Sequence, residues 1–511
     1  MNYYSIAMGG SGSRCAEALI YLSAAGLGPP GKLTLLFVDP DRANYSLDRA
    51  VRVAGYYQDL QAIQRGANCG MFTTEIALTE PKSWTPFAKG AMSPSLAKFF
   101  EYDTMRHRSP QDAGLFEMLY TPEQRRAVLD IGFRGRPSIG AAVFGSKIDL
   151  SKEEPWRTVA ANIASQSANS EVKIFSFGSL FGGTGAAGLP TVPRLLCLQK
   201  DPQTQEYKTD NLNPNVFAGA SLLLPYFAFT PTAAIGKDEV YAHCDAFLLN
   251  AKEALRYYAT CNPVFKRMYV LGSEALAMQE NFSIGGLNQN NKPAYVEFLA
   301  ALGARDFYDT PKEELASCQV GILGRHAEKE FGWRDVPDGA TVQRKLGQFT
   351  RTAFAFVKLF DPYFQELRAS PRTWYLDRPR RRAWYQDLME RRGVDPCKPE
   401  TDLLLERHLA FFKSYLEWLR DMHAGNQAAG GFKLLLADAT AFPRPEDPST
   451  LLDQKFGRLM MEQDQNPDRL EDVLRRLASC GPGVYADAAG LGYFQHALYD
   501  ACGYEQKERT S

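Results

Sequence analysis

Residues 175–190 read FSFGSLFGGTGAAGLP, and this stretch decides the fold. The apolar run before it, residues 172–177, predicts a strand, and the apolar residues of 189–196 predict a helix. The loop between them contains Gly182, Gly183 and Gly185. Glycines let the backbone approach a ligand closely, and a helix that begins in such a loop directs unpaired N–H groups at an anion. The stretch predicts a phosphate-binding turn, and the alternative is a tight turn without a ligand.

Two common phosphate motifs do not explain this loop. A Walker loop needs Lys and then Ser or Thr after its last glycine, whereas Leu189 and Pro190 follow Gly188. A dinucleotide fingerprint belongs to the first strand–helix unit of a domain, and this loop lies far into the chain.

A second glycine-rich turn lies near the N-terminus, between a strand predicted at residues 3–8 and a helix predicted from about Ala16. Its hydroxyl groups and its arginine suit phosphate oxygens. The candidate nucleotide-binding residues here are Gly9, Gly10, Ser11, Gly12, Ser13 and Arg14. Gly10 and Gly12 also form half of a dinucleotide fingerprint, but Cys15 stands at the position of the third glycine.

Together the two turns resemble the glycine signature of the tubulin/FtsZ superfamily, and divergent bacterial tubulin-like proteins are the nearest in kind. Residues 182–187, GGTGAA, are similar to the phosphate loop of that superfamily, with Thr184 among the candidate phosphate ligands, although Phe181 replaces a residue that is usually small. The resemblance covers roughly residues 1–310. It implies an α/β, Rossmann-like domain with a mainly parallel sheet and a central buried helix. It also implies GTP or GDP with Mg²⁺, and GTP hydrolysis between subunits that associate head-to-tail.

Carboxylates follow the next apolar run, residues 33–38, which ends in DPDRAN. Ligands of parallel sheets lie outside the carboxyl ends of the strands. Asp39 is therefore a candidate for a ribose hydroxyl or, through water, for Mg²⁺, with Asp41 and Asn44 beside it. The alternative is a simple Asp-Pro turn.

A third loop, residues 132–140, places two arginines among glycines. It follows a predicted helix with Thr121 as N-cap and Gln124 completing a capping box. Forked guanidinium donors suit a terminal phosphate. The resemblance to the tubulin/FtsZ superfamily implies that this loop contacts the terminal phosphate. The alternative is an ordinary surface loop. The candidates are Arg134, Gly135 and Arg136.

The resemblance also supplies candidates for the base and for hydrolysis. An almost wholly apolar helix is predicted from about Pro293 to Phe307, like the helix between the two domains of tubulin-like proteins. An asparagine near its start reads guanine in that family, so the candidates are Asn291 and, behind it, Asn290 and Asn250. Asparagines in loops also simply favour turns. The carboxylates after this helix, Asp306 and Asp309, are the catalytic candidates, although the activating motif of the family is not matched cleanly.

Composition sets the remaining bounds. The chain has 511 residues and a formal net charge of −1, which gives no global argument for nucleic-acid binding. Nine cysteines spread singly along the chain favour a reducing compartment, and the histidines do not combine with them at metal-ligand spacing. Without a signal peptide or a membrane span of roughly 20 apolar residues, we expect a cytoplasmic protein and no metal site built by the protein alone.

Two parts are expected: a nucleotide-binding domain at 1–310, with an insertion at about 45–130, and a helix-rich domain at 311–511. Strands are predicted in the second part at 319–323 and 432–436. Orthodox tubulins have a mixed α/β domain there, so this half departs from the family. Segment 372–392 interleaves arginines with aromatic residues. The pattern is explained first by a solvated helix whose long side chains cover the aromatics. The second explanation is a surface for a protein partner.

Three functions remain open from the sequence. The first is a tubulin/FtsZ-like GTPase that assembles head-to-tail into filaments or oligomers. The second is a nucleotide-gated interaction module without polymerisation or turnover, which docks a partner through its C-terminal half. The third is a Rossmann oxidoreductase, which the residue at Cys15 disfavours.

Overall fold

The computed structural model describes residues 2–64, 69–87, 94–129, 132–133, 135–204, 206–229, 246–261, 264–274, 276–279, 286, 291–325, 332–370, 379–428, 456, 459, 469–480 and 489–503. Everything below concerns these residues. The strand predicted at 432–436 lies outside them.

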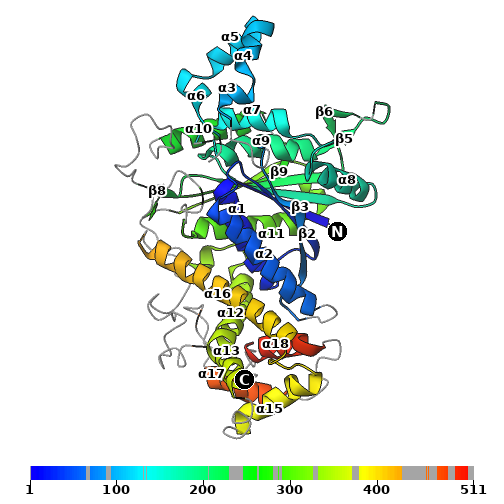
Figure 1. Cartoon of the computed structure of the whole chain (residues 1–511), viewed down its shortest axis with the longest axis vertical. Helices are drawn as coiled ribbons and strands as arrows, with labels where there is room; N and C mark the ends of the chain where they lie inside the picture. The colour runs from blue at the N-terminus through cyan, green and yellow to red at the C-terminus, as the bar shows by residue number, and fades with distance from the viewer. Residues whose placement is uncertain are drawn as a thin grey trace.

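A seven-stranded sheet of order β11-β9-β7-β4-β1-β2-β3 forms the centre of the molecule (Figure 1). Every neighbouring pair in it runs parallel. Strands covered on both faces read as continuous apolar runs, and β4 is buried at every position. The strands are β1 (Asn2–Met8), β2 (Gly31–Val38), β3 (Thr74–Trp84), β4 (Val172–Ser179), β7 (Val216–Leu223), β9 (Phe265–Ser273) and β11 (Gln319–Arg325).

Helices cover both faces of the sheet, and each face has its own apolar core. Alternate residues of β1 point to opposite cores: Tyr3 and Ala7 to one, Tyr4 and Ile6 to the other. The first face carries α1 (Gly9–Ala24), α2 (Tyr45–Ile63) and α11 (Tyr295–Asp309). The second face carries α7 (Pro137–Lys147), α8 (Trp156–Ser167), α9 (Gly183–Leu196) and α10 (Phe247–Cys261). The predicted α/β class with a parallel sheet is therefore confirmed.

Segment 45–130 is not an insertion throughout. Helix α2 belongs to the first face, and β3 pairs with β2 as an edge strand of the sheet. Sequence reasoning missed β3 because edge strands carry charge and proline, here Glu80, Pro81 and Lys82, which hide the apolar pattern. An arm of short helices does project beyond the sheet (Figure 1), and the capping box at Thr121 opens its last helix. The arm comprises α3 (Leu96–Phe99), α4 (Tyr102–Arg108), α5 (Pro110–Leu119) and α6 (Pro122–Arg126).

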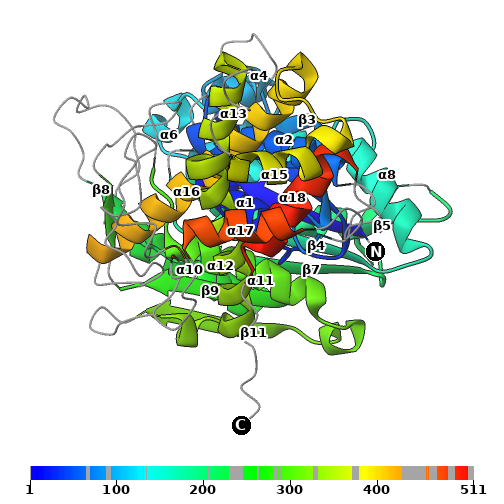
Figure 2. The ribbon, with the colours of Figure 1, turned by 90° about the horizontal axis from the view of Figure 1, so that it is seen from below.

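The chain after α11 first returns to the sheet as β11, so the sheet extends past residue 310. The later described elements are helical and lie on the other side of α1 and α2 from the sheet (Figures 1 and 2). These are η4 (Trp333–Asp335), α12 (Gly339–Ala355), η5 (Phe356–Phe360), α13 (Asp361–Ala369), α15 (Pro379–Leu388), η6 (Glu390–Arg392), α16 (Pro399–Ala428), α17 (Leu470–Ser479) and α18 (Gly490–Ala501), whereas the short η3 (Lys312–Leu315) precedes β11. The helix-rich C-terminal part is thus also confirmed.

Aromatic contacts join this helical part to the sheet. The ring of Tyr21 on α1 lies 5.1 Å from that of Trp418 on α16, and the ring of Tyr57 on α2 lies 6.3 Å from that of Phe411. One continuous apolar core therefore runs from the sheet into the helical part. Any displacement of α1 or α2 must be transmitted to α16 or break these contacts.

The described part of the Arg/aromatic segment 372–392 packs inward. Trp384 and Tyr385 are 0% and 3% exposed, and the Trp384 ring lies 4.9 Å from that of Phe360. The Arg392 guanidinium lies over the ring of Tyr493. These aromatics therefore belong to the core, and the interpretation as a partner surface is wrong for them. Among the described residues, no helix combines the length and the apolar character that crossing a bilayer requires.

Short strands complete the fold. They are β5 (Leu198–Lys200) and β6 (Tyr207–Leu212), which form an antiparallel pair, and β8 (Phe227–Phe229) and β10 (Ala277–Gln279), which form a parallel one.

Candidate functional site

The two glycine turns meet at the carboxyl ends of β1 and β4, which are neighbours in the sheet. A Cβ atom on Gly9, where α1 begins, would lie 3.2 Å from the Cβ of Thr184 in the first turn of α9. The chain leaves β1 toward β2 on one side and leaves β4 toward β7 on the other. The turns therefore occupy the topological switch point, where open α/β sheets bind ligands.

Both helices begin in these turns, so their unpaired N–H groups and positive dipole ends face the same region. Gly182 is the N-cap of α9, and neither cap has a side-chain acceptor. The backbone N–H groups at these two helix starts are thus available to an anion such as a phosphate.

Several of the glycines are required by packing. A Cβ on Gly12 would lie 2.7 Å from the carbonyl oxygen of Phe177, and one on Gly185 would lie 2.7 Å from the backbone nitrogen of Ser179. These two residues let α1 and α9 pack tightly on β4. Ser13 also acts within its helix, because its hydroxyl donates to the Gly9 carbonyl at 3.0 Å.

The third predicted loop lies against the second turn. A Cβ on Gly183 would lie 2.8 Å from the Cβ of Phe133 and 3.1 Å from the backbone nitrogen of Gly135. The Asn250 side chain on α10 donates to the Gly135 carbonyl at 3.4 Å. The Arg136 Nε is buried without a hydrogen-bond partner among the described residues, a donor that a phosphate oxygen would satisfy. Arg134 lies outside the described residues.

The acidic loop after β2 lies beside the first turn. One oxygen of buried Asp39 accepts the Asp41 N–H at 3.0 Å, and the other accepts the Asn44 amide at 3.0 Å. Asn44 in turn caps α2 by accepting the N–H groups of Ser46 and Leu47. A Cβ on Gly10 would lie 3.1 Å from the Asn44 amide nitrogen. Asp39 and Asn44 thereby position the start of α2 against the phosphate-facing turn, a role that the sequence interpretation did not include.

Asp41 is also engaged. Its carboxylate oxygens accept the Ala43 N–H at 3.0 Å and the Gly286 N–H at 2.7 Å. The loop is therefore held by its own carboxylates, as an Asp-Pro turn would be, and the Asp41 charge lies close enough to raise the pKa of Asp39.

Burial raises the pKa of Asp39 to about 8, and the nearby charge of Asp41 adds to the shift. The folded state then binds more protons than the unfolded chain between the ordinary value of 3.8 and about 8. We expect the free energy of unfolding of the ligand-free protein to fall as pH rises through this window. Asp39→Asn should flatten the slope, measured by urea denaturation at several pH values. Asp210→Asn, at a carboxylate whose side chain is 97% exposed, is the control and should leave the slope unchanged.

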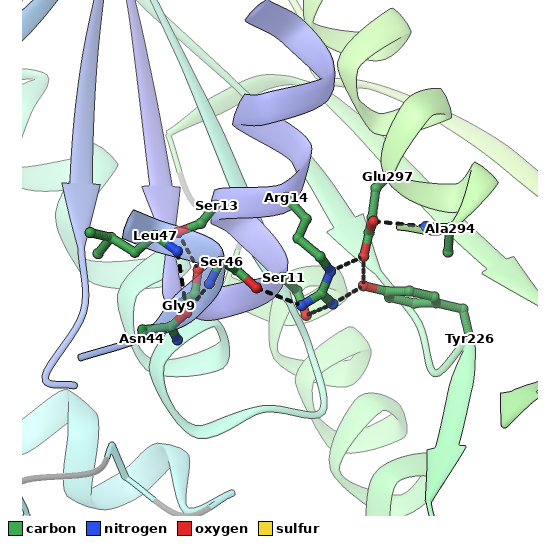
Figure 3. A network of polar contacts seen from close by, with 10 residues as sticks. All are labelled: Gly9, Ser11, Ser13, Arg14, Asn44, Ser46, Leu47, Tyr226, Ala294 and Glu297. Carbon is green, nitrogen blue, oxygen red and sulfur yellow. Dashed lines mark hydrogen bonds and ion pairs between the residues drawn. The ribbon is translucent and has the colours of Figure 1, made fainter. Parts of the chain in front are cut away.

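Arg14 forms a buried polar network instead of facing the turn freely (Figure 3). Its Nε donates to Glu297 at 2.5 Å, and Nη2 donates to the Tyr226 hydroxyl at 2.9 Å and to the Ser11 hydroxyl at 3.3 Å. Nη1 donates to Ser46 at 3.4 Å. Burial opposes the charge, but Glu297 and Tyr226 outweigh it and raise the pKa of Arg14. The prediction that Arg14 serves phosphate oxygens directly is not matched by this geometry.

Sequence reasoning missed Glu297, and with it Tyr226 and Ser46 of this network. Glu297 is 1% exposed, and its second oxygen accepts the Ala294 N–H at 2.9 Å at the start of α11. The available signal was a carboxylate in the otherwise apolar first turns of the helix, which predicts a buried cationic partner. The network links the turn after β1 to the central helix.

The base and catalytic candidates lie at opposite ends of α11. Asn291 precedes the helix at the Arg14 end, and Asn290 lies outside the described residues. At the other end, the Lys173 ammonium at the start of β4 donates to the carbonyls of Tyr308 and Thr310 at 2.8 Å and 2.6 Å. Within one chain, the catalytic candidates do not join the glycine turns.

Both catalytic candidates have cationic neighbours. Asp306 lies 3.2 Å from Arg267 and accepts the Tyr269 hydroxyl, and Asp309 lies 3.7 Å from Arg305. Burial raises the pKa of Asp309. Their side chains remain about half exposed, so a second molecule can reach them.

The chain was compared with protein families, curated proteins and solved structures. No protein-family model and no curated protein match the chain. Among solved structures it is similar to CetZ2 from Haloferax volcanii in a GTPγS-bound protofilament, at 15% identity and a TM-score of 0.26. The match covers 61% of this chain and 60% of that chain. The fold is defined by the strand order and pairing described above.

Proposed function

We propose that the chain is a tubulin/FtsZ-like protein that binds a guanine nucleoside triphosphate with Mg²⁺ where its three loops meet. The observation that carries the proposal is the contact between the Gly9 and Thr184 turns beneath two helix starts, at the switch point between β1 and β4. A triphosphate has enough phosphate oxygens to accept from both sets of backbone N–H donors at once.

The surrounding residues fit this ligand. Backbone N–H groups of the two turns would hold the phosphates, and the unpartnered Nε of Arg136 would meet the terminal one. Asp39 would accept a ribose hydroxyl or hold Mg²⁺ through water, because a cation favours the ionised form that burial opposes. The choice of guanine rests on the resemblance, with Asn291 and Asn250 as the candidates to read the base.

The nucleotide that co-purifies with the protein tests the proposal first, since it reports base and phosphate number together. In titrations with a fluorescent GTP analogue, we expect Thr184→Ala to weaken binding by roughly 10- to 100-fold, the equivalent of one hydrogen bond to a charged group. Thr191→Ala is the matched control, because the Thr191 hydroxyl bonds within α9 to the Ala187 carbonyl. Equal affinities for the two variants, or a preference for a nicotinamide cofactor, would contradict the proposal.

We further propose that the chain associates head-to-tail and hydrolyses GTP between subunits. The supporting observation is that Asp306 and Asp309 lie at the end of α11 away from the turns, so that the nucleotide they would act on is that of another subunit. Light scattering and phosphate release with GTP and Mg²⁺ are the tests, and Asp309→Asn should slow phosphate release. Nucleotide binding with neither signal at high protein concentration would instead favour a nucleotide-gated interaction module, whose helical part is coupled to α1 and α2 through the aromatic contacts.

A further inference from the structure

The two edges of the seven-stranded sheet differ in their protection. At one edge, β3 carries Glu75, Glu80, Pro81 and Lys82, and its register with β2 shifts between Leu35 and Phe37. Charge, proline and irregular register stop another strand from pairing with an edge. At the other edge, residues 319–323 of β11 read QVGIL and contain none of these features. One edge is blocked and the other is open.

The open edge is also apolar and uncovered. Strand β11 pairs with β9 over its whole length, and no described residue pairs with its outer side. Val320 and Ile322 are 52% and 77% exposed. Figure 2 shows β11 at the rim of the molecule, beyond the helices.

Val320 and Ile322 continue a buried face of the sheet. They share the side-chain direction of Cys318, which packs against the core beneath α7 to α10. The helical cover ends one strand earlier, where the ring of Tyr258 on α10 lies 6.2 Å from that of Phe265 on β9. The sheet therefore extends one strand past its covering layer.

We propose that β11 is a dimerisation edge, at which two copies of this chain pair antiparallel, β11 to β11, about a twofold axis at Gly321. The occupant must be an extended strand, because unpaired N–H and C=O groups along an edge are satisfied by another strand. The product is one sheet that continues across both copies.

A second copy fits because the edge is self-complementary. With Gly321 on the axis, Val320 of one copy lies opposite Ile322 of the other, twice, and no side chain obstructs the centre.

The size of the edge sets the strength of the contact. Aliphatic cross-strand pairs contribute about 0.2–1 kcal/mol each. A strand of this length also buries less than the roughly 1,600 Å² of a standard interface. We therefore expect a dimer whose population depends on protein concentration. It forms laterally through the sheet edge, independently of nucleotide and of any head-to-tail contact through α11.

Sedimentation velocity of the full chain over a range of concentrations, with EDTA and without nucleotide, tests the proposal. We expect a monomer–dimer equilibrium that Ile322→Lys weakens at least tenfold, since an edge lysine resists pairing. Met118→Lys is the matched control, because Met118 on α5 is 86% exposed and apolar but lies on no edge. A monomer at every concentration, or a dimer that Ile322→Lys leaves unchanged, would overturn the proposal.

A crosslink tests the register. Gly321→Cys, with exposed Cys261 and Cys397 changed to serine, should form a disulfide between copies on mild oxidation, because residues facing each other across antiparallel strands lie within disulfide reach. A cysteine at Val320 would face Ile322 instead and should crosslink far less. Equal crosslinking at both positions would contradict the twofold axis at Gly321.

Discussion

Replacing Glu297 by glutamine is expected to lower the free energy of unfolding by about 3–5 kcal/mol, because the Arg14 guanidinium would stay buried without a counter-charge. The two side chains are 5% and 1% exposed and lie 2.5 Å apart. Water cannot replace the lost carboxylate at such burial. The Tyr226 hydroxyl, which donates to Glu297 at 2.6 Å, would lose a charged acceptor as well.

Urea denaturation followed by circular dichroism measures this effect. Glu253→Gln is the matched control, since Glu253 pairs with Arg256 at 2.6 Å but both side chains are more than half exposed. An exposed pair of this kind contributes about 1 kcal/mol or less. Arg14→Met combined with Glu297→Leu should recover part of the loss, because an apolar pair leaves no buried charge. Equal losses for Glu297→Gln and Glu253→Gln would refute the importance of the network.

Gly183→Ala is expected to weaken nucleotide binding by roughly 10- to 100-fold, which corresponds to the 1–3 kcal/mol typical of overpacking. The added methyl would lie 2.8 Å from the Phe133 Cβ and 3.0 Å from the Phe133 carbonyl carbon. Backbone cannot rotate away as a flexible side chain can, so the loop that contains Gly135 and Arg136 must move from the turn. The three atoms nearest to the new methyl all belong to this loop.

Titration with a fluorescent GTP analogue and thermal unfolding together separate the two consequences. Gly145→Ala on α7 is the control, because a Cβ there would meet nothing within 4 Å. Alanine in a helix interior is favoured over glycine by about 0.5–1 kcal/mol, so this variant should bind normally and unfold at an equal or higher temperature. Normal binding by a well-folded Gly183→Ala protein would exclude the third loop from the site.

The sequence by itself determined the turns, the strands and the helix boundaries that depend on a few neighbouring residues. Glycine turns, the continuous apolar runs of buried parallel strands, the capping box at Thr121 and the apolar helix α11 all have signals within a few residues. The α/β class and the placing of glycine turns at strand ends followed from those signals. The order of the loops along the chain added the resemblance, and with it the candidates for base and hydrolysis.

Tertiary structure alone decided which residues are partners. Arg14 and Glu297 are 283 positions apart, and no local pattern pairs them. Strand β3 was hidden by the charges that protect an edge, and Trp384 looked like part of a surface because arginines surround it in the sequence. Whether a side chain is buried depends on residues that are distant in the sequence. The sequence around an arginine therefore does not show whether its guanidinium will contact a phosphate, a carboxylate or water. Local sequence specifies the strands and turns of the chain. The partner of each charged side chain is decided only when the strands assemble into the sheet and α11 packs against it.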